Sequence, residues 1–404
     1  MPATKRTKQK APPAKHRSAE PELLYRLSLS LQPFLFVAAG YCLWYLGFEN
    51  GPFKEIERLT HQDVSQYPGT ELPLRLSYVG VGPIDRLFSF LVAFFAPVVD
   101  GSSPDLALYS IVGLGQLGAG WTLFMMEGLR GGNLGKVVSF VGLYGVLVQN
   151  LGFALATPPY LFLHLLTSPI AKPIPLRSSL SDLLLITPHE LAILPFSVTL
   201  AYVVPALLMI IPAPSIVSYE THQALIAFWQ PFPIWTILIF GILKQLAPQA
   251  SINGIQTAST SPVVAYHEAA RRVYKYALLL CLFTHVPVLL ITAIPSAWLS
   301  SLVPKLATLN GSTILSVFVP AIPLSGHPMT SLANGCHNFL IWDFYIAGAA
   351  SLLWGIVLYR IAFPHGSLAG LLIRTALWTL ISGPFGALAI LFWKRDLVLK
   401  EKVK

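Results

Sequence analysis

Apolar segments about as long as a membrane-spanning helix recur along almost the whole chain, and they constrain its fold more than any other feature. A helix needs about 20 apolar residues to cross a bilayer. The candidate spans are residues 27–48, 84–99, 106–126, 137–157, 190–212, 225–246, 276–299, 337–359 and 372–393. The sequence therefore predicts an all-α, polytopic transmembrane helix bundle of about eight or nine spans.

The scarcity of charge supports a membrane protein. Hydrophobic residues make up 54% of the chain and charged residues only 11%, whereas a soluble domain carries roughly 25% charged residues. So few charges cannot cover a soluble surface, and the apolar excess must face lipid. We expect one transmembrane domain over residues 27–395, with lipid and a lipophilic small molecule as partners.

The termini are polar and basic. Residues 1–26 carry no signal-peptide pattern and are expected to be a disordered cytosolic tail, and residues 396–404 a second basic tail. The net charge of +9 therefore indicates membrane orientation and not nucleic-acid binding.

The last five residues match the dilysine pattern KxKxx through Lys400 and Lys402. This pattern resembles a cytosolic retrieval signal and predicts residence in the endoplasmic reticulum, although a generic positive tail is an equal alternative. A true signal requires both termini on one side and hence an even number of spans. Either residues 84–99 do not cross, or the apolar stretch 313–324 does.

Asp343 is the first candidate for chemistry. It lies about two turns inside the span 337–359, between Trp342 and Phe344. An acid inside a bilayer is costly and usually marks a function. Apolar surroundings favour its protonated form, which can donate a proton. Structural pairing with His337 or with an arginine is the alternative.

Glu127 is the second candidate, three residues before Arg130, so that the two can pair on one helical face. Counting spans places Glu127 and Asp343 near the same side of the membrane. We expect the two acids to form a pair, unless residues 313–324 cross. Interfacial snorkelling at the end of a span is the alternative for Glu127.

Aromatic residues are abundant, and their ring faces stabilise cations when water is excluded. An interior lined by aromatic residues suits a hydrophobic, transiently cationic substrate. Interfacial belts and lipid-facing packing are the alternative for most of them. The candidates are Trp121, Tyr144, Phe153, Trp229, Trp235, Trp342, Phe344 and Tyr345.

Several familiar motifs are absent from the sequence. It has no DDxxD, NDxxD or DxDD motif, no P-loop, no Rossmann glycine fingerprint and no GxSxG. The three cysteines are far apart and form no CxxC or Cys/His cluster. We therefore predict no metal site and no cofactor.

Three blocks together resemble a fungal family of integral-membrane terpene cyclases, of the kind that forms ascofuranone and more loosely of the indole-diterpene group. They are Trp121…Glu127-x-x-Arg130-x-x-Asn133, the stretch Leu191–Pro205 followed by Trp229-Gln230-x-Phe232-Pro233, and Phe339-Leu340-Ile341-Trp342-Asp343…Ala349…Leu353-Trp354. The resemblance covers roughly residues 80–395.

The resemblance implies acid-initiated cyclisation of a prenylated aromatic or polyketide, in which a carboxyl group opens an epoxide or protonates an alkene. It implies Asp343 and Glu127 as catalytic residues, with Asp343 the proton donor. The residues expected to bind or orient the substrate are Arg130, Asn133, Trp121, Trp342, Tyr345 and Asn338.

Two other functions remain open from the sequence. One is a transporter or exporter of a hydrophobic metabolite, although the mid-span charges are few and no inverted repeat is visible. The other is a non-catalytic membrane protein of the endoplasmic reticulum.

Overall fold

The structure is a computed structural model, and it describes residues 19–49, 51–61, 65–172, 182–246, 262–294, 309, 311–323 and 329–402. Within these residues the chain forms helices and loops, with one isolated bridge between Gln66 and Pro73. The predicted all-α bundle is confirmed.

The elements follow one another as α1 (Ala19–Ala39), the π-helix η1 (Gly40–Tyr45), α2 (Leu46–Glu49), α3 (Phe53–Thr60), α4 (Gly82–Val99), α5 (Pro104–Gly128), η2 (Gly131–Asn133), η3 (Val137–Ser139), α6 (Val141–Leu151), α7 (Phe153–Thr167), η4 (Pro169–Ala171), α9 (Pro188–Val198), η5 (Thr199–Val203), α10 (Val204–Met209), α11 (Tyr219–Trp229), α12 (Phe232–Leu246), α14 (Pro262–Ala293), α16 (Ile314–Phe318), α17 (Leu332–Ala362), α18 (Leu368–Asp396) and η7 (Leu397–Lys402).

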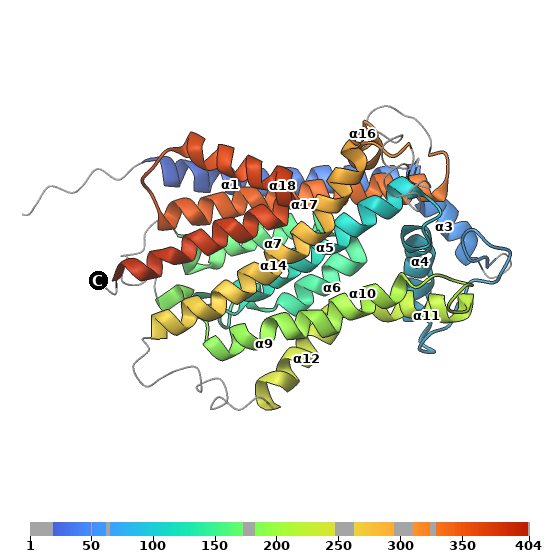
Figure 1. Ribbon diagram of the computed structural model, residues 1–404, viewed down its shortest axis with the longest axis horizontal. Coiled ribbons are helices and arrows are strands. Elements are labelled where there is room, and N and C mark those ends of the chain that lie inside the picture. Colours follow the sequence, from blue (N-terminus) through green and yellow to red (C-terminus); the bar gives the residue numbers. More distant parts are fainter. Residues whose placement is uncertain are drawn as a thin grey trace, which may run out of the picture.

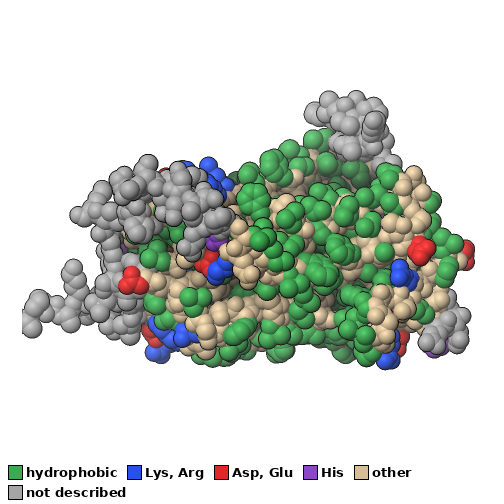
Figure 2. Space-filling view, turned by 90° about the horizontal axis from the view of Figure 1, so that it is seen from below, with side chains coloured by type: hydrophobic (Ala, Val, Ile, Leu, Met, Phe, Trp, Pro, Cys, Tyr) green, Lys and Arg blue, Asp and Glu red, His purple; other side chains and the backbone are tan. Residues whose placement is uncertain are grey.

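Seven helical segments among the described residues are long and apolar enough to cross a membrane, and the pair α11–α12, bent by 64°, would make eight. The long helices lie side by side along the long axis of the molecule (Figure 1). Large apolar side chains such as Phe196 and Phe283 are exposed on their outer faces. Figure 2 shows hydrophobic side chains spread over one such side, with charged residues mainly toward the two ends. This is the surface that a surrounding bilayer requires.

The two ends of the bundle differ. One end, here called the charged end, carries Glu127, Arg130, Arg395 and Asp396 in direct contact. The other end, here called the α4 end, is covered by α3 and α4.

Helix α4 covers this end of the bundle. The carboxyl group of Asp85, in its first turn, accepts hydrogen bonds from the backbone N–H groups of Tyr78 and Val79 at 2.8 and 2.7 Å. At its other terminus, four residues separate α4 from the start of α5. Figure 1 shows α4 lying across the α4 end. Both of its termini thus lie near that end, which favours the alternative in which residues 84–99 do not cross.

Residues 137–157, expected as one span, instead belong to a helical hairpin that enters the bundle and returns. Helix α6 runs inward to Leu151, the chain turns at Gly152 with φ 95°, and α7 runs back. At the base of the hairpin, the Ser168 hydroxyl donates to Asn133 Oδ1 at 2.6 Å. The Tyr160 hydroxyl, on α7, donates to the carbonyl oxygen of Val138 at 2.8 Å. Irregular backbone at membrane depth is tolerated here because the surrounding helices bury it.

Helix α18 is a second hairpin. Its backbone breaks at Gly383, where φ is 72° and ψ is 175°. The side chains of Leu371 and Lys394, which lie on opposite sides of this break, line one small pocket together. Figure 1 shows the two halves of α18 folded back against each other.

The tips of the two hairpins meet inside the bundle. The rings of Phe153 and Phe385 stack with centroids 5.0 Å apart and planes 18° from parallel. The Gln116 side chain of α5 holds the second tip, donating to the Ser382 carbonyl at 2.9 Å and accepting the Phe385 N–H at 3.0 Å. A polar side chain from a long helix therefore fixes the second tip.

Both ends of the described chain lie at the charged end. Glu20, in the first turn of α1, pairs with Arg360, and Asp396 pairs with Arg130. Two ends on one side of the bundle mean an even number of crossings, which is what the dilysine pattern requires. Helix α1 begins at Ala19, earlier than the expected boundary at residue 27, and residues 1–18 lie outside the described residues.

In residues 313–323, the described part of the apolar stretch 313–324, the chain forms the five-residue helix α16, which is too short to cross. It packs against α5 and α14. The stretch therefore adds no crossing between α14 and α17.

Candidate active site

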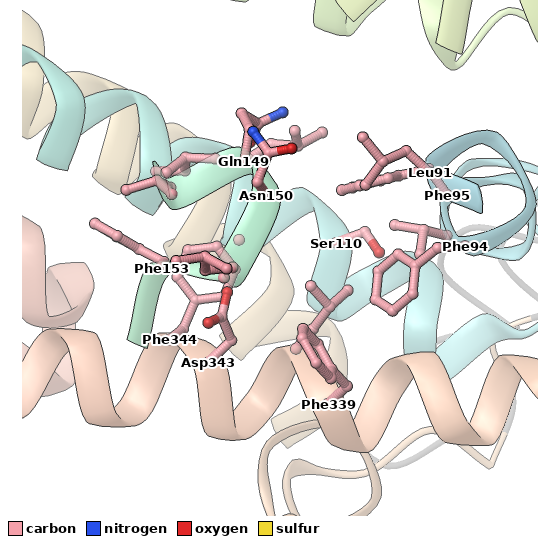
Figure 3. Close-up of a pocket in the computed structure, with 18 of the residues that line it drawn as sticks. Leu91, Phe94, Phe95, Ser110, Gln149, Asn150, Phe153, Phe339, Asp343 and Phe344 are labelled. Atoms are coloured by element: carbon pink, nitrogen blue, oxygen red, sulfur yellow. The ribbon is translucent and has the colours of Figure 1, made fainter. Parts of the chain in front are cut away.

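A cavity of about 110 Å³ lies where α17 faces α4, α5, α11 and the tip of the α6–α7 hairpin. A single water needs roughly 10–15 Å³ of such space, so the cavity has room for part of an organic molecule. Figure 3 shows the tip of the hairpin above the cavity and α17 below it. Its walls are mainly apolar, and the rings that line it are Trp44, Phe53, Phe90, Phe94, Phe95, Tyr109, Phe153, Trp229, Phe339 and Phe344.

Asp343 supplies the carboxyl group of this cavity. It sits on α17, is 6% exposed, and points toward the tip of the hairpin (Figure 3). Its Oδ1 atom accepts the backbone N–H of Ala154, in the first turn of α7, at 2.7 Å. The N-terminus of a helix has unpaired N–H groups and a positive dipole end, so it orients an acceptor placed there. The first hairpin tip is thus held by Asp343, as the second is held by Gln116.

Gly152 makes this close approach possible. A Cβ atom at this position would lie 3.0 Å from Asp343 Oδ1 and 3.0 Å from a methyl group of Leu43. Its φ of 95° with ψ of 153° is also a conformation that is essentially restricted to glycine. The hairpin tip can therefore reach the carboxyl group only with glycine at residue 152.

Aromatic rings surround the carboxyl group and the space beside it. Phe344 packs edge-on against Phe153 at 6.0 Å, and Phe339 packs edge-on against Phe94 at 5.2 Å. Such rings present negative faces to a cation and keep water away. The cavity therefore combines an acid with an apolar environment that can tolerate a short-lived positive charge.

Glu127 lies in a different environment, at the charged end. It is fully buried, and its Oε2 atom is 2.6 Å from Arg130 Nε and 2.9 Å from Arg395 Nη2. Arg130 also contacts Asp396 at 3.0 Å. Two arginines and two acids in contact form a balanced buried cluster, in which removing any one member leaves an uncompensated charge.

The structure does not bring Glu127 and Asp343 together. Both acids lie beside α7. Glu127 Oε1 is 3.8 Å from His164 Nε2, and Asp343 accepts the backbone N–H of Ala154. Ten residues of helix at 1.5 Å per residue separate these two points by about 15 Å. The expected pairing of the acids fails because the α6–α7 hairpin has Glu127 beside its base and Asp343 at its tip.

Arg130 and Asn133 belong to the cluster around Glu127. Asn133 donates to the Glu127 carbonyl oxygen at 2.8 Å and accepts from Ser168, which joins the two ends of the hairpin. Trp121 is buried one to two turns before Glu127, and its indole N–H donates to Thr236 at 3.1 Å. None of these three is among the residues that line the cavity around Asp343.

The other three predicted substrate-binding residues lie on α17 but outside the cavity lining. Trp342 packs against a second apolar cluster formed by residues of α1, η1, α7 and α17. The hydroxyl of Tyr345, a residue 43% exposed, donates to the Phe318 carbonyl at 2.5 Å. Asn338 accepts the N–H of Ala321 at 2.8 Å. Tyr345 and Asn338 thus attach the 313–324 stretch to α17.

Sequence reasoning missed Phe94, Phe339 and Gly152, which shape the cavity. Phe339 is four residues, about one helical turn, before Asp343, so helical spacing alone indicates that both face the same side. Gly152 is a weaker signal, because the sequence shows it only as a glycine next to Phe153. Phe94 is predictable only from the contact between α4 and α17, which no local pattern encodes.

Comparison with known proteins places the chain in a family. Residues 27–400 match the CtvD domain. The chain is 30% identical to terpene cyclase ascI of Acremonium egyptiacum over 80% of each chain. It is 27% identical to terpene cyclase penA of Penicillium crustosum over 94% of this chain and 100% of that one. It is 26% identical to terpene cyclase ctvD of Aspergillus terreus over 88% and 94%. No solved structure matches.

Each of these matches covers at least 80% of this chain. It belongs to the CtvD-domain family of fungal meroterpenoid terpene cyclases. It is accordingly an enzyme of the terpene cyclase type.

Proposed function

We propose that this protein is a membrane-bound terpene cyclase that starts cyclisation by proton transfer from Asp343 to a prenylated substrate in the cavity. The observation that carries the proposal is a buried carboxyl group on the wall of a cavity lined mainly by aromatic rings. A lipophilic substrate reaches such a site from the bilayer. Burial favours the neutral acid, and only the neutral acid can donate a proton.

The reaction balances without a redox partner. The proton passes from the Asp343 carboxyl group to the oxygen of a terminal epoxide, or to a carbon of a terminal alkene. In the epoxide case a C–O bond breaks, and a neighbouring double bond attacks the electron-deficient carbon to form a C–C bond. The final cation either loses a proton or is trapped by an internal hydroxyl group, whose proton then leaves. In both cases one proton is released and replaces the one that Asp343 gave, so the product is an isomer of the substrate.

The cavity walls contribute after the proton has moved. Ring faces such as those of Phe94, Phe153, Phe339 and Phe344 stabilise a desolvated cation by about 2 kcal/mol or more when they are well placed. They also exclude water, which would otherwise quench the cation and yield an open-chain alcohol.

Glu127 remains a predicted catalytic residue, but its contacts favour a positioning role. Its two arginine partners balance the charge of a carboxylate, and a carboxylate has no proton to donate. Glu127 and Asn133 instead hold the base of the hairpin whose tip contacts Asp343. Under this proposal Arg130 and Asn133 act on the substrate only through that hairpin.

The cellular setting is also part of the proposal. Both described ends lie at the charged end, the arrangement that a cytosolic Lys400–Lys402 signal requires. We place the enzyme in the endoplasmic reticulum membrane on this basis. Because the sequence lacks the aspartate-rich diphosphate motifs, the proposed initiation uses the Asp343 proton and needs neither metal nor cofactor.

The test is Asp343→Asn in the full chain reconstituted in lipid, assayed on a prenylated phenol with a terminal epoxide. Asparagine keeps an oxygen to accept the Ala154 N–H but has no acidic proton. Because general acid catalysis contributes roughly 100- to 10,000-fold, we expect product formation to fall by at least about 100-fold. The thermal midpoint should change little.

The matched control is Gln116→Glu at the second hairpin tip, which keeps an acceptor for Phe385 N–H but introduces an acid there. It should not restore cyclisation when combined with Asp343→Asn. Normal turnover by Asp343→Asn would show that Asp343 is only a cap for α7, and the proposed acid would be wrong.

A further inference from the structure

A second, smaller pocket lies at the charged end, between α17 and the two arms of α18, which are the helical halves before and after Gly383. It holds about 20 Å³ and shares no lining residue with the cavity of Asp343. Its lining residues are Tyr359, Leu371, Arg374, Thr375, Trp378, Ala387, Ile390, Leu391 and Lys394. The two charged residues among these are both cations, so the pocket suits an anion.

The fold of α18 brings the two cations to one level of the bundle. Arg374 lies nine residues before the break at Gly383, and Lys394 lies eleven residues after it. At 1.5 Å per residue, these positions differ in height along the hairpin by about 3 Å. Lys394 directly precedes Arg395, which belongs to the buried cluster of the charged end. The pocket is therefore at the end of the bundle, the depth at which a bilayer has its headgroups.

Neither cation is neutralised by an acid among the described residues. Lys394 has no hydrogen-bond or ion-pair partner there, and Arg374 donates only to the backbone of the preceding turn, at 3.0 Å. Asp396, two residues from Lys394, is occupied by Arg130 and by two tyrosine hydroxyls. Like charges that line one pocket repel each other, and an anion bound between them removes this repulsion.

The rest of the pocket and its surroundings indicate that this anion is a lipid. Leu371, Ile390 and Leu391 give the pocket an apolar wall. Trp378 and Tyr359 are aromatic residues of the kind that is enriched at headgroup depth. The first arm of α18 also exposes large apolar side chains, which are Leu372, Ile373, Leu377, Leu380 and Ile381. A soluble anion gains nothing from these surfaces, whereas a phospholipid can place its headgroup at the cations and its chains along the arm.

We propose that this pocket binds the phosphate of an anionic phospholipid, which Arg374 and Lys394 contact from the two arms of α18. Basic pockets between transmembrane helices on the cytosolic side bind such headgroups, and the topology proposed above puts the charged end on that side. A lipid bound there joins the arms of the hairpin whose tip stacks Phe385 on Phe153. It therefore stabilises the second hairpin from its open end, as Gln116 does from its tip.

The test is native mass spectrometry of the full chain in detergent, titrated with phosphatidylserine or with phosphatidylcholine of the same acyl chains. Each Lys or Arg near an anionic headgroup contributes about fivefold in affinity. With two cations, we expect the first phosphatidylserine to bind about 25-fold more tightly than phosphatidylcholine. Arg374→Gln and Lys394→Gln should each reduce this preference by about fivefold. Lys394→Arg keeps the charge and should keep the preference.

Lys275→Gln is the matched control. Lys275 is an exposed cation at the same end of the bundle, next to Tyr274, which donates to Asp396 at 2.6 Å, but it does not line the pocket. This variant should keep the full preference, and soluble glycerophosphoserine should not displace the lipid.

Three results would overturn the inference. They are equal affinity of the wild type for the two lipids, an equal loss in Lys275→Gln, and displacement of the lipid by the soluble headgroup at the same concentration. The readout is lipid binding, so it does not depend on whether Asp343 is the acid.

Discussion

Replacing Gly152 by alanine tests how closely the hairpin tip must approach Asp343. The added Cβ atom would lie 3.0 Å from Asp343 Oδ1, whereas ordinary contacts begin at 3.4 Å. The carboxyl group or the tip must therefore move by about 0.4 Å. If a displacement of 1 Å costs about 100-fold in rate, 0.4 Å costs about sixfold.

The same substitution also strains the backbone. Gly152 has φ 95° and ψ 153°, and placing alanine in this region costs about 1–3 kcal/mol. We expect a lower thermal midpoint and about sixfold lower turnover per folded molecule. The assay measures epoxide conversion in lipid, normalised to the folded fraction from intrinsic fluorescence.

Gly135→Ala separates strain from the contact with the acid. Gly135 also has a positive φ, 72°, but no atom lies within 4 Å of the position of its Cβ. It should lose stability while keeping wild-type turnover per folded molecule. If Gly152→Ala also kept wild-type turnover per folded molecule, the close seating of Asp343 against α7 would have no catalytic meaning.

Three further variants test other parts of the account. Glu127→Gln leaves Arg130 and Arg395 under-compensated and should lower the free energy of unfolding by about 3–5 kcal/mol; a stable but inactive variant in chemical denaturation would instead favour direct catalysis by Glu127. Gln116→Leu leaves the Phe385 N–H and the Ser382 carbonyl unpaired and should cost about 1–3 kcal/mol for each group, read as a lower thermal midpoint. Phe339→Leu keeps an apolar wall but removes a ring face and should lower turnover by about 30-fold, with more water-quenched product in the chromatogram; an unchanged product profile would count against cation stabilisation by this ring.

The sequence predicted the fold class because charge scarcity and apolar length are properties of composition and local pattern. It could not predict which apolar segments cross. Residues 137–157 and 372–393 are apolar enough to span, yet Gly152 and Gly383 turn the chain back inside the bundle. That outcome depends on partners such as Asp343 and Gln116, which lie far away in the sequence.

The candidate site was also predictable only in part. Asp343 was found because an acid within an apolar helix is conspicuous in any sequence. Pairing it with Glu127 failed because residues 137–157 were counted as a crossing. The hairpin at Gly152 returns the chain to the end where it began, so an odd number of crossings separates the end of α5 from the start of α17.

The central claim is that Asp343 is a neutral acid inside an apolar cavity. Infrared difference spectroscopy of wild type against Asp343→Asn, in lipid at neutral pH, observes this group directly. We predict a C=O stretching band of a protonated carboxylic acid that shifts in deuterated water and is missing from the variant. A wild-type spectrum that shows only carboxylate bands for Asp343 would contradict the account.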